Sequence, residues 1–257
     1  MSDQPMSFAR VICADARTRL SYDRALGSTT TRARLLLADP PYLLFERRRR
    51  DGDIRSASSR GPRKLDHEGV IRFANEAAFS AFQSAWMEKA LPRVEDDGAA
   101  AIWTNSVGRK ATLAAAAAVG WPHLAAEFFW AKRTVRRSSE STASEDWARI
   151  YERALVLTRK PRVKITALDG LAALSGYASD SGHPHEKSFT AIAPLIRALS
   201  TRKDVVLVPF AGTGGEAAAA ARLGRSVAAL EIREEWALQA ARAVARASEE
   251  SNASILE

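Results

Sequence analysis

The stretch Leu35-Leu36-Leu37-Ala38-Asp39-Pro40-Pro41-Tyr42 decides how the rest of the chain is interpreted. Its four apolar residues predict a buried strand that is parallel to its neighbours and covered on both faces. Asp39 ends this strand, because the two prolines that follow lack N–H donors and have a fixed φ. Ligands of open α/β sheets bind at the carboxyl ends of strands, so this position suits a binding or catalytic site. The alternative for so short a motif is a structural turn after a core strand.

The composition limits the class of protein. The chain has 257 residues, of which 46% are hydrophobic, and this suits a single α/β domain spanning residues 1–257. The net charge of +8 favours a polyanionic partner, nucleic acid before membrane. A single cysteine, Cys13, excludes an internal disulfide and a cysteine-based zinc site, and we expect no metal. Without a signal-peptide layout or a membrane-spanning apolar run, we expect a cytoplasmic monomer or homodimer.

A second informative stretch lies near the other end of the chain, from Val205 to Glu231. A hydrophobic strand, a glycine-containing turn, a helix and a second strand ending in an acid form the layout of a nucleotide-binding βαβ unit. Gly212 and Gly214 allow close approach of the backbone to a ligand and positive φ. Glu231 lies near the spacing expected for a carboxylate that binds ribose hydroxyls. The alternative is a tight structural turn.

The remaining elements fit the same α/β architecture. We expect further strands at 9–14, 99–103, 127–132 and 151–158. Helices are expected at 17–26, 68–91, 109–119, 187–199, 216–223 and 233–247, followed by a frayed end over 248–257. Two polar segments interrupt this pattern: residues 46–68, which predict a mobile basic surface loop, and residues 133–144.

Taken together, the two motifs resemble those of the amino-directed DNA methyltransferases. Asp39-Pro40-Pro41-Tyr42 resembles their catalytic motif, and the turn from Pro209 to Gly214 resembles their cofactor loop. Three weaker features are similar to segments of the family: Asp15 before the catalytic strand, the segment 129–132 with Tyr151-Glu152, and the segment 183–188. Because the catalytic motif precedes the cofactor loop, the order resembles the permuted β-group.

The resemblance implies a Rossmann-like fold with one mostly parallel sheet, helices on both faces, and S-adenosylmethionine as the cofactor. It implies the catalytic residues Asp39, Pro40, Pro41 and Tyr42. It also implies cofactor contacts from Asp15, Asp39, His183, Lys187, Ser188, Pro209, Phe210, Ala211, Gly212, Thr213, Gly214, Glu231 and Ile232. Within this set, Asp15 would bind the adenine amino group, and Lys187 would pair with the cofactor carboxylate unless it is a surface lysine.

The function predicted in this way is methyl transfer to the exocyclic amine of a flipped base in double-stranded DNA. Asp39 and the Pro40 carbonyl would accept the amine hydrogens, and Tyr42 would stack on the base. Trp130 is a second stacking candidate, although a core position suits it better, and Trp103 and Trp121 are assigned to the core. Predicted DNA contacts are Arg47, Arg48, Arg49, Arg50, Arg60, Arg63, Lys64, Lys132, Arg133, Arg136 and Arg137.

Several alternatives remain open from the sequence. Asp at the first motif position favours adenine N6 in this family, and cytosine N4 is the alternative target because the chemistry is the same. Residues 133–182 would form a short target-recognition region. An RNA substrate is a further alternative, and a non-catalytic DNA-binding module with a methyltransferase fold is the alternative of another class.

Overall fold

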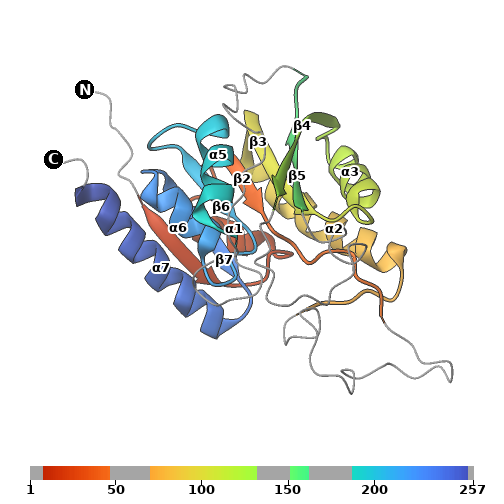
Figure 1. The fold of residues 1–257 in the computed structure, drawn as a ribbon, viewed down its shortest axis with the longest axis horizontal. Coiled ribbons are helices and arrows are strands. Elements are labelled where there is room, and N and C mark those ends of the chain that lie inside the picture. Colours follow the sequence, from red (N-terminus) through yellow and green to blue (C-terminus); the bar gives the residue numbers. More distant parts are fainter. Residues whose placement is uncertain (1–7, 47–69, 132–150, 162–186, 254–257) are drawn as a thin grey trace, which may run out of the picture.

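In the computed structural model of the protein, the residues described are 8–46, 70–131, 151–161 and 187–253. They form a seven-stranded sheet with helices on both faces (Figure 1). The strands are β1 (Ala9–Cys13), β2 (Ala33–Ala38), β3 (Val94–Thr104), β4 (His123–Ala131), β5 (Tyr151–Thr158), β6 (Val205–Val208) and β7 (Ser226–Glu231). The helices are α1 (Arg19–Leu26), α2 (Glu76–Ala90), the 3-10 turn η1 (Leu91–Arg93), α3 (Arg109–Ala118), α5 (Phe189–Leu199), α6 (Gly215–Arg222) and α7 (Glu234–Ala253).

The strand order is β1-β7-β6-β2-β3-β5-β4, and every neighbouring pair from β1 to β3 is parallel. β5 is antiparallel to both β3 and β4. The expected Rossmann-like architecture, a mostly parallel sheet with helices on both faces, is therefore confirmed. Its most important consequence is that β2 and β6, which carry the two sequence motifs, are hydrogen-bonded neighbours at the centre of the sheet.

The leucine run of β2 is buried because helices cover both sides of the sheet. Leu35 and Leu37 point into the cluster formed with α5, α6 and α7, whereas Leu36 and Ala38 point into the cluster formed with α1, α2 and α3. All four side chains are fully buried. A continuous apolar run, rather than an alternating one, is what a central parallel strand requires.

The predicted start of the helix at 68–91 is wrong. α2 begins at Glu76, with the Asn75 side chain accepting a hydrogen bond from Ala78 N (2.9 Å) as its N-cap. Phe73 is unavailable to the helix because its N–H donates to Leu44 O (2.7 Å) and it forms a parallel bridge with Phe45. The described residues on either side of the segment 47–69 are therefore hydrogen-bonded to each other.

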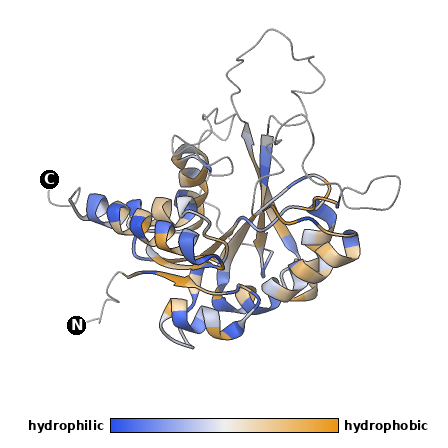
Figure 2. Ribbon diagram, turned by 90° about the horizontal axis from the view of Figure 1, so that it is seen from below, coloured by the Kyte–Doolittle hydropathy of each residue, from blue (hydrophilic) through white to orange (hydrophobic). Residues whose placement is uncertain are grey.

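The predicted fraying of residues 248–257 is also wrong in part, because α7 continues to Ala253. Figure 2 shows hydrophilic and hydrophobic residues alternating along this helix. Its apolar face buries Ala240, Val244 and Ala247 against α6 and the sheet. In the described part of the chain, no helix is long and apolar enough to cross a membrane.

Candidate active site

The candidate site lies along the carboxyl edge of the parallel strands. Asp15 follows β1, Asp39 follows β2, the turn 209–214 follows β6, and Glu231 ends β7. Because these four strands are parallel and adjacent, their last residues lie along one edge of the sheet. The structure therefore brings together predicted residues that come from both ends of the chain.

The two glycines of the turn do different things. Gly212 has a φ of +52°, and a Cβ placed on it would meet nothing within 4 Å. Gly214 has a φ of +102°, and a Cβ there would lie 2.7 Å from Ala240 Cα on α7. The space over Gly212 is open to a ligand, whereas Gly214 is required by the packing of α7 against the start of α6.

The other turn residues are set by neighbouring elements. Ala211 is buried, and its N–H donates to Leu230 O (2.8 Å) on the adjoining strand. Phe210 packs edge-on against Trp86 of α2, with ring centroids 5.2 Å apart. Pro209 is buried and Thr213 is half-buried. The turn is thus fixed on its inner side and exposes backbone on its outer side.

Glu231 is the residue that holds the turn in place. Its Oε2 accepts a hydrogen bond from Gly212 N (2.8 Å), and its Oε1 accepts one from Arg233 N (2.9 Å). The side chain is buried, at 7% exposure. The next residue, Ile232, is 61% exposed and offers an apolar surface beside this carboxylate. A carboxylate oxygen carries two lone pairs, so Glu231 retains acceptor capacity for a ligand hydroxyl.

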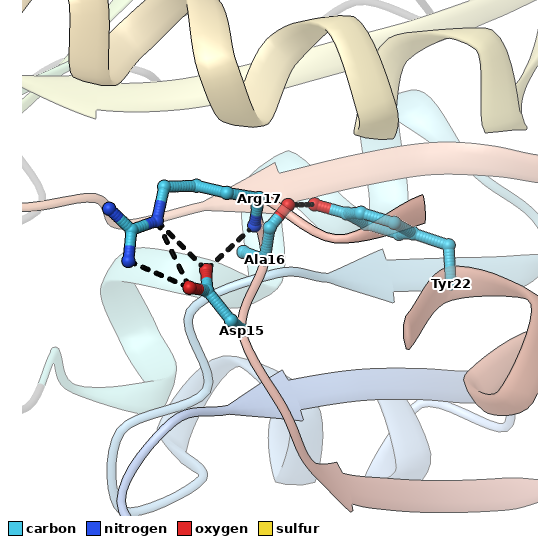
Figure 3. Close-up of polar contacts among 4 residues, drawn as sticks. All are labelled: Asp15, Ala16, Arg17 and Tyr22. Carbon is cyan, nitrogen blue, oxygen red and sulfur yellow. Dashed lines mark hydrogen bonds and ion pairs between the residues drawn. The ribbon is translucent and has the colours of Figure 1, made fainter. Parts of the chain in front are cut away.

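Asp15 is fully engaged by its own neighbour Arg17 (Figure 3). Arg17 N donates to Asp15 Oδ1 (2.8 Å), and the guanidinium reaches both carboxylate oxygens. These hydrogen bonds lower the pKa of Asp15. The loop is fixed further by the buried Tyr22, whose hydroxyl donates to Ala16 O (2.6 Å). Asp15 is thus a rigid, ionised carboxylate at the edge of the site.

Asp39 lies at the other side of the turn and makes an ion pair with Lys187, which closely precedes α5. The ammonium of Lys187 bonds Asp39 Oδ2, whereas Asp39 Oδ1 is buried and receives no hydrogen bond from the residues that the structure describes. The interpretation of Lys187 as a surface lysine is wrong, because its side chain is 2% exposed. Asp39 therefore offers one oxygen as a free acceptor.

Two acids that were not assigned to the site from the sequence complete this cluster, which we call the Lys187 cluster: Lys187 with Asp39, Glu152 and Glu216. Glu152 Oε2 lies 3.4 Å from Lys187 Nζ, and Glu216 Oε1 lies 4.0 Å from it. Burial would lower the pKa of Lys187, but the three carboxylates outweigh it and raise this pKa. The ammonium is therefore permanently charged.

Glu216, on the first turn of α6, has a raised pKa. Burial raises its pKa, Lys187 lowers it, and Asp39 and Glu152 raise it again, with a result of about 7. Its Oε1 has no hydrogen-bond partner in the described part of the chain. The sequence signal for Glu152 was its place after Tyr151 in the family-like segment, whereas Glu216 gave no signal beyond being the first acid of α6.

Tyr42, in the loop after β2, contacts the Lys187 cluster through Glu152. Its hydroxyl donates to Glu152 Oε2 (3.3 Å). Burial, with the charges of Asp39 and Glu152, raises the pKa of Tyr42, so the hydroxyl stays protonated. The loop itself is tied down by Asn105, which donates to Leu43 O (2.9 Å). Asn105 also accepts a hydrogen bond from Gly108 N (2.8 Å), so it connects this loop to the start of α3.

The tryptophans expected in the core are there. Trp103, Trp121 and Trp130 are each at most 1% exposed. Ser188, predicted as a cofactor contact, is the half-buried N-cap residue of α5, next to Lys187. Several predicted residues lie outside the described residues: His183 and the candidate DNA contacts Arg47, Arg48, Arg49, Arg50, Arg60, Arg63, Lys64, Lys132, Arg133, Arg136 and Arg137.

Comparisons with known proteins agree with this architecture. The chain is similar over 96% of its length to the cytosine-N4-specific PvuII DNA methyltransferase, with a TM-score of 0.64 and 15% identity, covering 92% of that chain. It is similar over 91% of its length to M1.HpyAVI in complex with SAM, with a TM-score of 0.63 and 16% identity, covering 99% of that chain. A third match is TTHA0409 of Thermus thermophilus complexed with S-adenosyl-L-methionine (TM-score 0.58, 20% identity, 93% of this chain and 94% of that one). These likenesses establish the fold, which is that of the Rossmann-like methyltransferases.

The sequence comparisons match part of the chain. The model of the DNA methylase family of N6/N4 type matches residues 146–242, from before β5 into α7. A stretch of 60 residues is 37% identical to the "Putative methylase YubD" of Escherichia coli K12, and it spans 23% of this chain and about a quarter (26%) of that protein. Residues 146–242, less than half of the chain, thus match the DNA methylase family, and the described part of the chain has the fold of the Rossmann-like methyltransferases.

Proposed function

We propose that this chain transfers the methyl group of S-adenosylmethionine to the exocyclic amine of a base flipped out of double-stranded DNA, and that the base is adenine. The observation that carries the proposal concerns Asp39, which follows β2. Its Oδ1 is buried and has no hydrogen-bond partner among the described residues, and the neighbouring strand β6 leads into the open glycine turn. The match of residues 146–242 to the N6/N4 DNA methylases supports the same reaction class. The motif order of the permuted β-group is part of this proposal.

The residues at the carboxyl edge fit the cofactor. The open space over Gly212 gives room for close approach of the cofactor to the backbone. Exposed Ile232 suits the apolar ring of an adenosine, and Glu231 beside it suits the ribose hydroxyls. Asp15 is a rigid acceptor for the adenine amine once one of its hydrogen bonds to Arg17 is exchanged.

The mechanism follows from the poor nucleophilicity of an exocyclic amine, whose lone pair is conjugated into the ring. When bound, S-adenosylmethionine would supply an electrophilic methyl group on a positively charged sulfur, and that sulfur would keep the electron pair of the broken S–C bond and leave as a neutral thioether. Asp39 Oδ1 and the Pro40 carbonyl accept the two amine hydrogens and turn the nitrogen towards tetrahedral geometry. Its lone pair then points at the methyl group, and one N–H proton leaves through Asp39 after the new N–C bond has formed. Positioning and electrostatics carry such a reaction without a covalent intermediate.

Tyr42 holds the base in this arrangement. Its ring stacks on the flipped base while its protonated hydroxyl remains bonded to Glu152. Asn105 and the bridge between Phe45 and Phe73 hold the loop from both sides, so the stacking surface is rigid. Stacking offsets part of the cost of unpairing the base from the duplex.

DNA is proposed to approach the same edge. The bridge between Phe45 and Phe73 joins the described residues on either side of the basic segment 47–69, which supports a contribution of this segment near the Asp39 loop. Ala131 pairs with Tyr151 across the segment 132–150, and residues 133–182 are proposed as the target-recognition region. We expect replacement of Arg47 to Arg50 by alanine to weaken DNA binding and reduce its salt slope by about one unit per lost phosphate contact. If DNA binding by the variant had the same salt slope as binding by the wild type, residues 47–50 would not contact the DNA phosphates.

The second candidate target is the N4 amine of cytosine. The PvuII enzyme, which the chain resembles in fold, is described as cytosine-N4-specific. Both amines need the same two acceptors, so Asp39 and Pro40 serve either base. Our choice of adenine rests on the aspartate at the first position of the motif.

The test is methylation of unmethylated genomic DNA with labelled cofactor, followed by mass spectrometry of the nucleosides. N6-methyladenine is the expected product. N4-methylcytosine would keep the mechanism and overturn the choice of base. If cofactor binds but neither product forms, methyl transfer to DNA is disproved, and competition with RNA separates an RNA methyltransferase from a non-catalytic DNA-binding module.

A further inference from the structure

The Lys187 cluster is the most densely charged buried group among the residues described. One ammonium faces carboxylates from three different elements: Asp39 after β2, Glu152 of β5 and Glu216 of α6. The aromatic rings of Trp103 and Tyr42 lie over the same ammonium, at 4.8 and 5.8 Å from ring centroid to Nζ. A buried charge of this kind is expensive to maintain unless its partners are well placed.

The contacts of Lys187 disfavour the pairing with the cofactor carboxylate that the family resemblance implies. Its ammonium already lies among three carboxylates, and it donates a hydrogen bond to one of them, Asp39. A fourth carboxylate would enter a pocket that carries a net negative charge when its acids are ionised.

The contacts of Asp39 suggest a different role. A free aspartate side chain rotates about χ1 and χ2, and only some of its orientations would aim an oxygen at the base amine. Here Oδ2 is bonded to Lys187, which leaves Oδ1 buried and without a partner in the described residues. The backbone beside Lys187 is fixed in turn, because Ser188 O accepts from Ala191 N (3.0 Å) at the start of α5.

We infer that Lys187 is a positioning residue for methyl transfer, which binds one oxygen of Asp39 so that the other is aimed at the base amine. Glu152 and Glu216 hold the ammonium from the far side and set its position. Lys187 itself touches neither the base nor the cofactor. This inference rests on the proposed function, because it concerns the reaction for which Asp39 is the acceptor.

The experiment separates the two roles of Lys187 by measuring rate and affinity independently. Lys187→Met is compared with wild type in single-turnover methylation of genomic DNA at saturating cofactor, and in calorimetric titration with S-adenosylmethionine. We expect the rate to fall on the order of 10²-fold, as for a misplaced catalytic group, and the cofactor Kd to stay within about threefold. Lys187→Arg, which keeps the charge, should recover at least about tenfold of the lost rate. Lys89→Met, an exposed lysine on α2, is the matched control and should behave as wild type.

Lys187→Met leaves one buried acid, Glu216, and two partly buried acids, Asp39 and Glu152, without their cation, so folding is checked by circular dichroism. If Lys187→Met fails to fold, Glu152→Gln is used as the test variant in its place. This substitution weakens one ion pair of Lys187 and keeps the pair of Lys187 with Asp39. We then expect an intermediate loss of rate with unchanged cofactor affinity.

Three results would overturn the inference. The first is a cofactor Kd raised tenfold or more in Lys187→Met at an unchanged rate, and the second is a folded Lys187→Met with normal rate and affinity. The third is an equal loss of rate and cofactor affinity that Lys187→Arg does not restore. An inactive wild-type protein would instead disprove the proposed function, and the two failures are therefore distinguishable.

Discussion

The two halves of the site are held together by different forces. The cofactor half, around Gly212 and Glu231, is fixed by backbone N–H groups that donate to one buried carboxylate. The base half, around Asp39, is fixed by a buried ammonium among three carboxylates. In the proposed reaction, the first half would recognise the cofactor by shape and hydrogen bonds, whereas the second would present one carboxylate oxygen of Asp39 as an acceptor. Substitutions in the two halves should therefore have different effects on stability, cofactor binding and the rate of methyl transfer.

The largest effect is expected from Asp39→Ala. This change removes the acceptor for the amine hydrogen, and the rate of methyl transfer should fall by about 10³-fold or more. Cofactor and DNA binding should persist, since Lys187 keeps Glu152 and Glu216 as partners and the fold loses no core contact. Rate is measured in a single turnover with labelled cofactor, and DNA binding by fluorescence anisotropy. Near-normal turnover of this variant would refute the catalytic assignment of Asp39.

The glycine turn offers a pair of substitutions with opposite consequences. Gly214→Ala places a Cβ against Ala240 at a φ of +102°, and it should lower the free energy of unfolding by roughly 2 to 5 kcal/mol. Gly212→Ala meets no neighbour and should cost about 1 to 2 kcal/mol for its positive φ, but it fills the space proposed for the cofactor. Urea unfolding and cofactor titration of both variants measure the contrast. If Gly212→Ala binds cofactor as tightly as wild type, the cofactor does not approach this turn.

The sequence predicted which motif residues meet at one edge of the sheet better than it predicted the acids that surround Lys187. Asp39, the glycine turn and Glu231 lie within short motifs whose parallel strands gather them at one edge, so a linear pattern was enough to find them. Glu216 acquires its role only through burial beside Lys187, and periodicity cannot reveal which acid of a first turn is covered.

The errors in element boundaries have similar causes. The start of α2 was wrong because Phe73 hydrogen-bonds Leu44 in the loop, a pairing between segments that helical spacing does not encode. The length of α7 was underestimated because its last turns are stabilised by packing on α6 rather than by their own sequence. In both cases a tertiary contact overrode the local pattern.

A smaller effect concerns the titration of Glu216 in the base half. With a pKa raised from 4.5 to about 7, the folded protein keeps a proton that the unfolded chain loses. The free energy of unfolding should therefore fall as pH rises between about 5 and 7, by about 2 to 3 kcal/mol, and stay low above that range. The charged groups that face Glu216 are Asp39, Glu152 and Lys187, so a variant of Glu216 alone is needed to separate its titration from theirs.

Glu216→Gln tests this pH dependence. The variant should lose the decline between pH 5 and 7 and be more stable than wild type at pH 8, as measured by urea unfolding at a series of pH values. Glu235→Gln, an exposed acid on α7, is the matched control and should follow the wild-type curve. A decline that persists unchanged in Glu216→Gln would show that another group is responsible.

The smallest effect is expected in the cofactor half, from Arg17→Ala. The guanidinium and Asp15 are both partly exposed, and such surface ion pairs contribute at most about 1 kcal/mol. Arg17 N still donates to Asp15 in the variant, so the carboxylate keeps its orientation and gains free acceptor positions for the adenine amine. We expect cofactor affinity to rise by no more than about fivefold in calorimetric titration, with Arg19→Ala unchanged as a control. A loss of tenfold or more would identify Arg17 as a cofactor ligand in its own right, and charge would then contribute to both halves of the site.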